Sequence, residues 1–151
     1  MFSIEAIMST NLITVAPSAT LAEARAAMQD NRIHHLPITD GKTLVGLLTL
    51  TNVLAATDSF LRDDRNRIHA NEIIVGDVMV KDVATVDINA SLRQAALFLE
   101  RHQIGCLPVL DGGDLVGIIT DTDFVAVAIN LLEQIEATEP VEDDFGDADV
   151  A

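Results

Sequence analysis

Two side chains near the C-terminus have the types and spacing to bind a small polar molecule. Thr120 and Asp123 stand three residues apart, at the expected start of a helix. An ionised carboxylate accepts two hydrogen bonds at once, so Asp123 could bind both hydroxyls of a vicinal diol, whereas it would repel a phosphate. The same pair could instead only cap the helix, a role worth about 1 kcal/mol. The sequence leaves both interpretations open.

The same arrangement occurs twice because the chain contains an internal repeat. A shift of 71 residues, from 33 to 104, superposes IHHLPITDGKTLVGLLTLTN (33–52) on IGCLPVLDGGDLVGIITDTD (104–123) without a gap. Thr49 and Asn52 of the first copy take the places of the threonine and the aspartate, and the asparagine lacks the negative charge. A site between the two copies should therefore come in two related versions.

Two histidines and one cysteine are the other candidates for chemistry. His34 and His35 are adjacent, so on a strand they point to opposite faces and cannot act together on one ligand. Each histidine could be an ordinary surface or core residue, a phosphate contact or a metal ligand. Metal binding is disfavoured because no cysteine or carboxylate lies at ligand spacing. Cys106 is expected to be an inert buried thiol, because no nearby base would lower its pKa. No nucleophile and base pair is visible, so we predict that the protein is not an enzyme and binds no metal.

Composition and charge exclude several classes of protein. The 151 residues carry a formal net charge of -15, which opposes binding to nucleic acid. Polar residues interrupt every apolar run before the roughly 18 residues needed to span a membrane. The chain has a single cysteine and its first residues lack the features of a signal peptide. We therefore expect a cytoplasmic protein with no membrane or nucleic-acid partner.

The negative charge is concentrated at the C-terminus. Eight acidic residues and no Lys or Arg fall between 133 and 151. Like charges repel and few apolar groups are present, so the chain from Pro140 onward is expected to be a solvated tail. The alternative is a docking segment for a basic partner.

Each copy is predicted to form the same series of elements. Thr20 with Glu23, and Ser91 with Gln94, fit the capping box that starts a helix. Apolar residues then recur at helical spacing, so each helix has one apolar side that needs a sheet to cover. Turns such as Asp40-Gly41 are typical of tight hairpins. The expected strands are 13–15, 36–39 and 44–49 in the first copy and 84–86, 107–110 and 115–120 in the second, with closing helices from near Thr51 and Thr122.

These elements predict an α+β fold of two tandem βαββα units with pseudo-twofold symmetry. One unit buries only one face of its sheet, so the two should pack sheet against sheet and share a core. The connector is expected to be a solvated helix or loop, although its basic residues could instead bind an anion or a neighbouring subunit. The predicted boundaries are 4–57 for the first repeat, 58–77 for the connector, 78–132 for the second repeat and 133–151 for the acidic tail.

The paired motifs resemble a known family. Leu36-Pro37 is followed by Gly46-Leu-Leu-Thr49, and Leu107-Pro108 is followed by Gly117-Ile-Ile-Thr120. Occurring twice at one spacing, they resemble the CBS domain pair, named after cystathionine β-synthase and also called a Bateman module. The resemblance covers about 4–131 and is strongest to stand-alone bacterial pairs of the acetoin-utilisation type. It implies adenosine-containing ligands in clefts between the repeats, dimers shaped as a flat disc, and no catalysis.

The resemblance also implies which residues would line the two clefts. In one cleft Thr120 and Asp123 would bind the ribose, while the neutral Gly105 and Cys106 stand where the family often has phosphate-binding cations. In the other cleft Thr49 and the uncharged Asn52 would take the ribose. The remaining residues of the first cleft would be Met8, Ile13, Ile33 and the backbone of His34, and those of the second would be Met79, Ala84 and Ile104 beside the base, with His34 and His35 at the phosphate positions.

The resulting expectation is a non-catalytic regulatory module that senses AMP, ADP, ATP or S-adenosylmethionine and requires no cofactor. It would pass its signal to a separate protein target through altered packing. The apolar helix over 124–132 is expected to form a homodimer. The competing hypothesis is a structural or protein-interaction module with vestigial clefts, which Asn52 and the neutral Gly105 and Cys106 favour.

Overall fold

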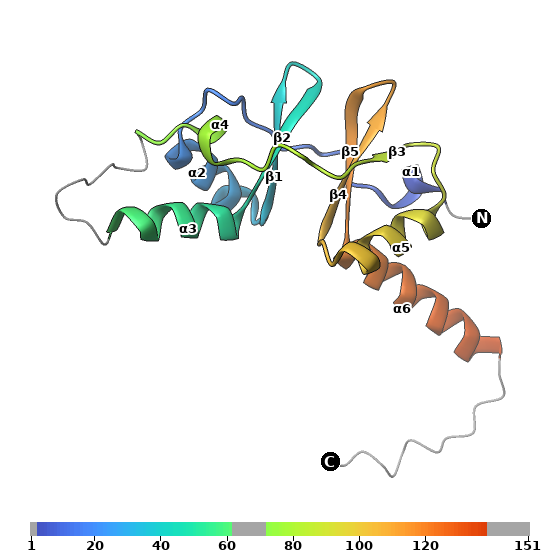
Figure 1. The fold of residues 1–151 in the computed structure, drawn as a ribbon. Helices are drawn as coiled ribbons and strands as arrows, with labels where there is room; N and C mark the ends of the chain where they lie inside the picture. Colours follow the sequence, from blue (N-terminus) through green and yellow to red (C-terminus); the bar gives the residue numbers. More distant parts are fainter. Residues whose placement is uncertain (1–2, 62–71, 139–151) are drawn as a thin grey trace, which may run out of the picture.

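The protein consists of two similar halves placed side by side (Figure 1). The structure, a computed structural model, describes residues 3–61 and 72–138. Each half has a β-hairpin with helices packed below it, and the two hairpins stand side by side. The elements in chain order are α1 (Ile4–Ile7), α2 (Leu21–Asn31), β1 (His35–Asp40), β2 (Thr43–Thr49), α3 (Leu50–Leu61), α4 (Val75–Val78), β3 (Val86–Asp87), α5 (Leu92–His102), β4 (Cys106–Asp111), β5 (Asp114–Thr120) and α6 (Asp121–Thr138).

The strands form one five-stranded sheet in the order β1-β2-β5-β4-β3. Each hairpin is antiparallel, and β3 runs parallel to β4. The hairpins meet near their tips, where Thr43 pairs with Asp114 and the Leu115 N–H donates to the Lys42 carbonyl (2.9 Å). The predicted α+β tandem repeat is confirmed, but the expectation of two separate sheets is wrong because this edge contact joins them.

The capping boxes predicted for the two main helices are present. Thr20 Oγ1 accepts from the Glu23 N–H (3.1 Å), and Ser91 Oγ accepts from the Gln94 N–H (3.0 Å). In both cases the N3 side chain accepts from the backbone N–H of the capping residue in return. Both helices also end in the same way, at a residue with left-handed backbone conformation that terminates the helical hydrogen bonding.

The buried apolar residues form two clusters, so the expectation of one shared core is also wrong. One cluster lies between α2, α3 and the first hairpin, and the other lies between α5 and the second hairpin. A short helix from the other part of the sequence packs into each cluster. Ile4 of α1, near the N-terminus, is fully buried in the second cluster, and Val75 of α4, which follows the connector, is fully buried in the first. The halves are therefore interlocked, and packing crosses the repeat boundaries drawn along the chain.

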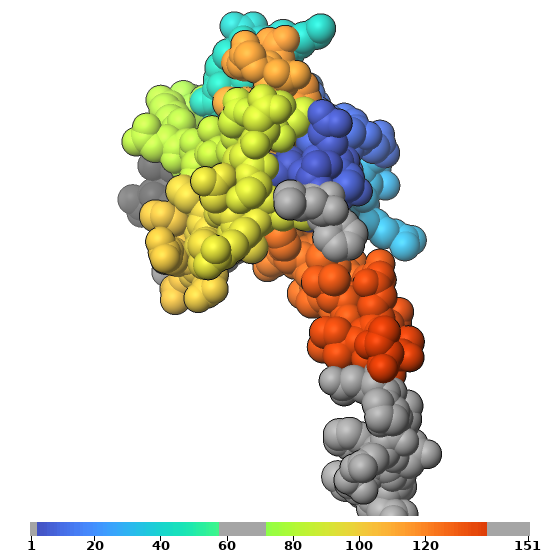
Figure 2. Space-filling model, turned by 90° about the vertical axis from the view of Figure 1, so that its right-hand side faces the viewer, coloured from blue at the N-terminus to red at the C-terminus, as the bar shows by residue number. Residues whose placement is uncertain are grey.

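The C-terminal helix α6 extends well beyond the core. It continues to Thr138, so residues 133–138 of the expected tail are helical. The rest of the tail, from 139, lies outside the described residues, as does most of the connector, 62–71. Figure 2 shows α6 projecting away from the rest of the molecule, and none of its residues is buried. Within the described residues, no helix combines the length and apolar character needed to cross a membrane.

Candidate functional site

A hollow of about 320 Å³ lies between the two halves. We call it the inter-repeat hollow. It contains four of the residues predicted for the second cleft: His35 and Thr49 from the first half, and Ala84 and Ile104 from the second. Its full lining is His35, Leu47, Thr49, Val80, Asp82, Val83, Ala84, Ile104, Gly105 and Cys106.

The crossing of the chain between the halves builds this hollow. After α4, Val80 pairs with Leu47 of β2, and each residue donates its N–H to the carbonyl of the other (2.9 and 2.8 Å). This bridge holds the following segment, down to Ala84, against the first hairpin. On the opposite wall, Cys106 begins β4. The lining therefore depends on both halves keeping their relative position.

Thr49 is held at the hollow by Asn52. Asn52 Oδ1 accepts from the Thr49 N–H (3.0 Å) and from Thr49 Oγ1 (2.7 Å), and the Asn52 N–H donates to Thr49 Oγ1 (3.1 Å). These contacts form a capping box at the start of α3. Asn52 is not part of the lining, so in this structure it orients the threonine.

Thr120 and Asp123 form the corresponding cap at the start of α6. Asp123 Oδ2 accepts from the Thr120 N–H (2.8 Å) and from Thr120 Oγ1 (3.3 Å). Asp123 lines a different hollow of about 360 Å³, whose other walls come from α1 and α6. The capping role is thus present, and the ribose role stays a prediction.

The remaining apolar candidates lie in the cores. Ile13 and Ile33 pack against the first cluster, and neither lines the inter-repeat hollow or the hollow at Asp123. Met8 packs against the second cluster and Met79 against the first, each in contact with a glycine of the opposite half. Neither of these two hollows therefore brings Met8, Ile13 and Ile33 together with Asp123.

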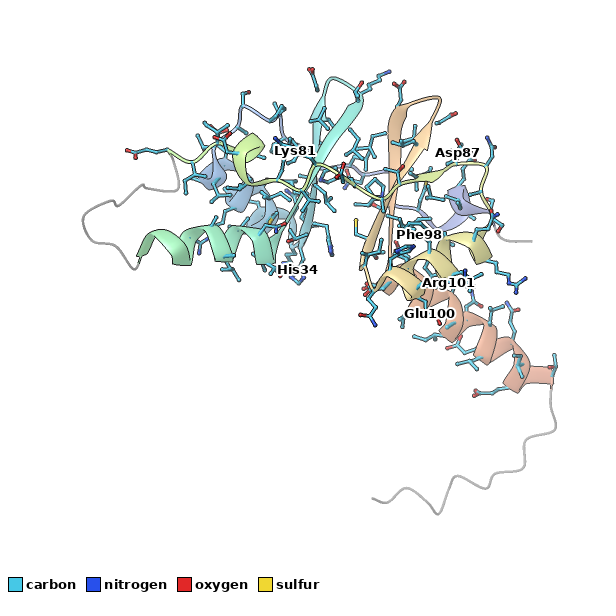
Figure 3. The ribbon with its side chains drawn as sticks, in the orientation of Figure 1. His34, Lys81, Asp87, Phe98, Glu100 and Arg101 are labelled. Carbon is cyan, nitrogen blue, oxygen red and sulfur yellow. The ribbon has the colours of Figure 1, made fainter. Side chains whose placement is uncertain are left out.

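The two histidines differ in their surroundings, as expected for neighbours at the start of a strand. His34 is exposed at the lower end of the first hairpin (Figure 3). The His35 ring is half-buried, and a Cβ placed on Gly105 would lie 3.5 Å from its Nε2. Burial lowers the pKa of His35 below 6.5, Asp121 opposes this shift, and His34 adds to it. At neutral pH, His35 therefore contributes an uncharged ring.

Cys106 is buried where β4 begins. Burial, followed by the negative charges of Asp121 and Asp123, raises its pKa to about 12. The thiol therefore stays protonated at physiological pH, which agrees with the inert role expected from the sequence. Among residues 3–61 and 72–138, no group of three or more His, Cys, Asp or Glu side chains is placed to hold a metal ion.

Four residues of the hollow were missed in the sequence: Leu47, Val80, Asp82 and Val83. The segment 80–83 carries no motif, and its position depends on pairing with a strand more than 30 residues earlier in the chain. One feature of the sequence indicates indirectly that this segment lies near the cleft, because it directly follows Met79, a residue expected to line the cleft.

Comparisons with known proteins identify the family of this chain. The CBS domain family model matches residues 4–59 and 75–144. The crystal structure of a protein assigned to acetoin utilization (AcuB) from Vibrio cholerae is 40% identical, with a TM-score of 0.77 over 93% of this chain and 99% of that one. CBSX2, solved in complex with AMP, is 27% identical, with a TM-score of 0.74 over 87% of this chain and 99% of that one.

A curated relative has the same extent. CBS domain-containing protein YhcV of Bacillus subtilis is 29% identical over 137 residues, which cover 91% of each chain. The resemblance carried by the paired motifs is thus confirmed by the family match, the shared fold and a relative of similar length. The chain belongs to the CBS domain family, as a tandem pair of these domains.

Proposed function

We propose that this protein is a non-catalytic regulatory module that binds an adenosine-containing ligand in the inter-repeat hollow. The observation that carries the proposal is that both halves line this hollow. A ligand in this hollow contacts both halves, so it binds more tightly to one relative arrangement of the halves than to others. Binding therefore shifts the population toward that arrangement. The complex of CBSX2 with AMP supports the choice of ligand.

The chemistry of the lining suits a nucleoside. Apolar surface for a purine comes from Leu47, Val80, Val83 and Ile104, and Thr49 adds a hydroxyl oxygen to the lining. The volume of about 320 Å³ lies at the lower end of the range typical for small-molecule sites. We assign the ligand to this hollow because residues of both hairpins line it, whereas the one at Asp123 is lined by helices α1 and α6 alone.

The two threonine caps provide a matched test. Calorimetric titration with adenosine, AMP, ATP and S-adenosylmethionine would be carried out on the wild type, Thr49→Val and Thr120→Val. Both substitutions remove the same capping contacts, but only Thr49 lines the hollow. We expect Thr49→Val to weaken binding about tenfold, and Thr120→Val to leave the affinity within about twofold.

The outcomes separate the hypotheses. No heat with any of the four compounds would contradict ligand sensing and would favour the vestigial clefts of the interaction hypothesis. Loss of binding in Thr120→Val alone would move the site to the Asp123 side while leaving the sensing function in place.

We also propose that α6 forms the contact of a homodimer. Val125, Ile129 and Leu132 recur on one side of this helix and are 56%, 52% and 56% exposed. Large apolar side chains gathered in one stripe indicate an interaction surface. Light scattering should give twice the mass of the chain for the wild type and the monomer mass for Ile129→Glu. The control Gln134→Glu adds the same charge outside the stripe and should remain dimeric.

A further inference from the structure

The charges around the inter-repeat hollow are negative. Asp82 lines it, and Asp121 Oδ2 would lie 3.6 Å from a Cβ placed on the lining residue Gly105. Within the described lining, His35 is the one side chain able to carry a positive charge, and burial holds its ring neutral at pH 7. Cys106 stays a neutral thiol. A phosphate entering the hollow would therefore meet carboxylates without a side-chain cation among these lining residues.

Several backbone amides at the helix starts beside the hollow already donate to groups of the protein. Proteins often bind phosphate with the free N–H groups at a helix N-terminus. At the start of α3, however, the Thr49 N–H donates to Asn52 Oδ1 (3.0 Å), the Leu50 N–H donates to the His34 carbonyl (2.9 Å), and the Asn52 N–H donates to Thr49 Oγ1 (3.1 Å).

The start of α6 is occupied in the same way. The Asp121 N–H donates to the Gly105 carbonyl (3.1 Å), and the Thr122 N–H donates to Asp121 Oδ1 (2.9 Å). The helix dipole of α3 remains, but it is equivalent to only about half a positive charge. Two full carboxylate charges outweigh it.

We infer that the inter-repeat hollow selects an adenosine-containing ligand without phosphate, whose 5′ substituent is neutral or positively charged, such as a thioether or a sulfonium. This inference rests on the proposed function and narrows its ligand class. The negative charge of Asp82 attracts a sulfonium and repels a phosphate dianion, and it has little effect on the binding of an uncharged thioether.

Lys81 does not reverse this balance. It is exposed and is not part of the lining, although it directly precedes Asp82 in the chain.

Three compounds that share adenosine and differ at the 5′ position test the inference. Calorimetry at pH 7.5 and low salt would compare 5′-methylthioadenosine, S-adenosylmethionine and AMP on the wild type. We expect the first two to bind at least about tenfold more tightly than AMP. The difference should shrink as NaCl is raised toward 1 M, since salt screens the repulsion.

A matched pair of charge variants identifies the source of the selectivity. Asp82→Asn removes the lining carboxylate and should strengthen AMP binding about threefold or more, with 5′-methylthioadenosine nearly unchanged. Asp87→Asn removes the same charge from β3, outside the lining, and keeps an acceptor for the Asn89 N–H (Figure 3). It should leave both affinities unchanged.

Each contrary result has a distinct meaning. AMP binding as tightly as 5′-methylthioadenosine to the wild type, or equal effects of Asp82→Asn and Asp87→Asn, would overturn the inference and leave the proposed function standing. Absence of binding for all three compounds would overturn the proposed function, and the inference with it.

Discussion

The sulfur atom of Met8, from the first repeat of the sequence, lies directly against Gly117 of β5, in the second repeat. A Cβ placed on Gly117 would lie 2.5 Å from Met8 Sδ and 3.2 Å from the Ser9 carbonyl oxygen. Met79 lies against Gly46 of β2 in the same way. The absence of a side chain at these glycines lets the segment after each short helix cross onto the other half.

We predict that Gly117→Ala destabilises the protein by about 1–3 kcal/mol, because the new methyl group would displace Met8 or the crossing segment. Urea unfolding would measure the loss. Gly105→Ala is the matched control, since its Cβ would make only ordinary contacts, the nearest at 3.5 Å. A Met8→Ala background should reduce the penalty by at least about 0.5 kcal/mol. Equal stability of the two alanine variants would contradict the proposed close contact.

The capping boxes lead to a second prediction. Ser91→Ala removes the acceptor for the Gln94 N–H and should lower the free energy of unfolding by about 1 kcal/mol. Ser91→Asp keeps a capping oxygen and should stay within about 0.5 kcal/mol of the wild type. Chemical denaturation compares the three proteins, and an unaffected Ser91→Ala would show that this cap does not contribute.

A third prediction concerns pH. Burial lowers the pKa of His35, so between 6.5 and that lower value the unfolded chain binds more protons than the folded one. The contribution of this neutral ring to stability is complete above pH 6.5 and is lost as the pH falls below it. The melting temperature of the wild type should therefore fall more between pH 7.5 and 5.5 than that of His35→Gln.

His102→Gln, at an exposed position on α5, is the control for replacing a histidine by glutamine elsewhere in the protein. Asp121 and His34 face or adjoin His35 and are retained in all three proteins. A pH dependence that is identical in His35→Gln and the wild type would show that the environment of this ring does not lower its pKa.

Most of the local structure could be predicted from the sequence, but the strand expected over 13–15 is wrong, because only Val15 pairs there, in an isolated bridge to Ile38. Thr20 and Ser91 are at the helix starts that their capping boxes indicated, and both hairpins turn where glycine and aspartate occur. These features depend on neighbouring residues, whose preferences act over a few positions. The internal repeat, which aligns without a gap, also predicted that the molecule has two related halves.

The relative arrangement of the halves could not be predicted in the same way. The burial of α1 in the second core, and the bridge between Val80 and Leu47, are contacts between distant parts of the chain with no local pattern. As a result Asp82 was missed. Asp123, whose charge made it the most prominent candidate in the sequence, instead lines a hollow beside α1.

The central claim is that a nucleoside binds between the halves, and a crystal structure of the protein with 5′-methylthioadenosine tests it most directly. We predict electron density for the ligand in the inter-repeat hollow, in contact with Thr49 of the first half and with Ala84 or Ile104 of the second. Density confined to the hollow beside Asp123, or contacts with one half alone, would contradict the account.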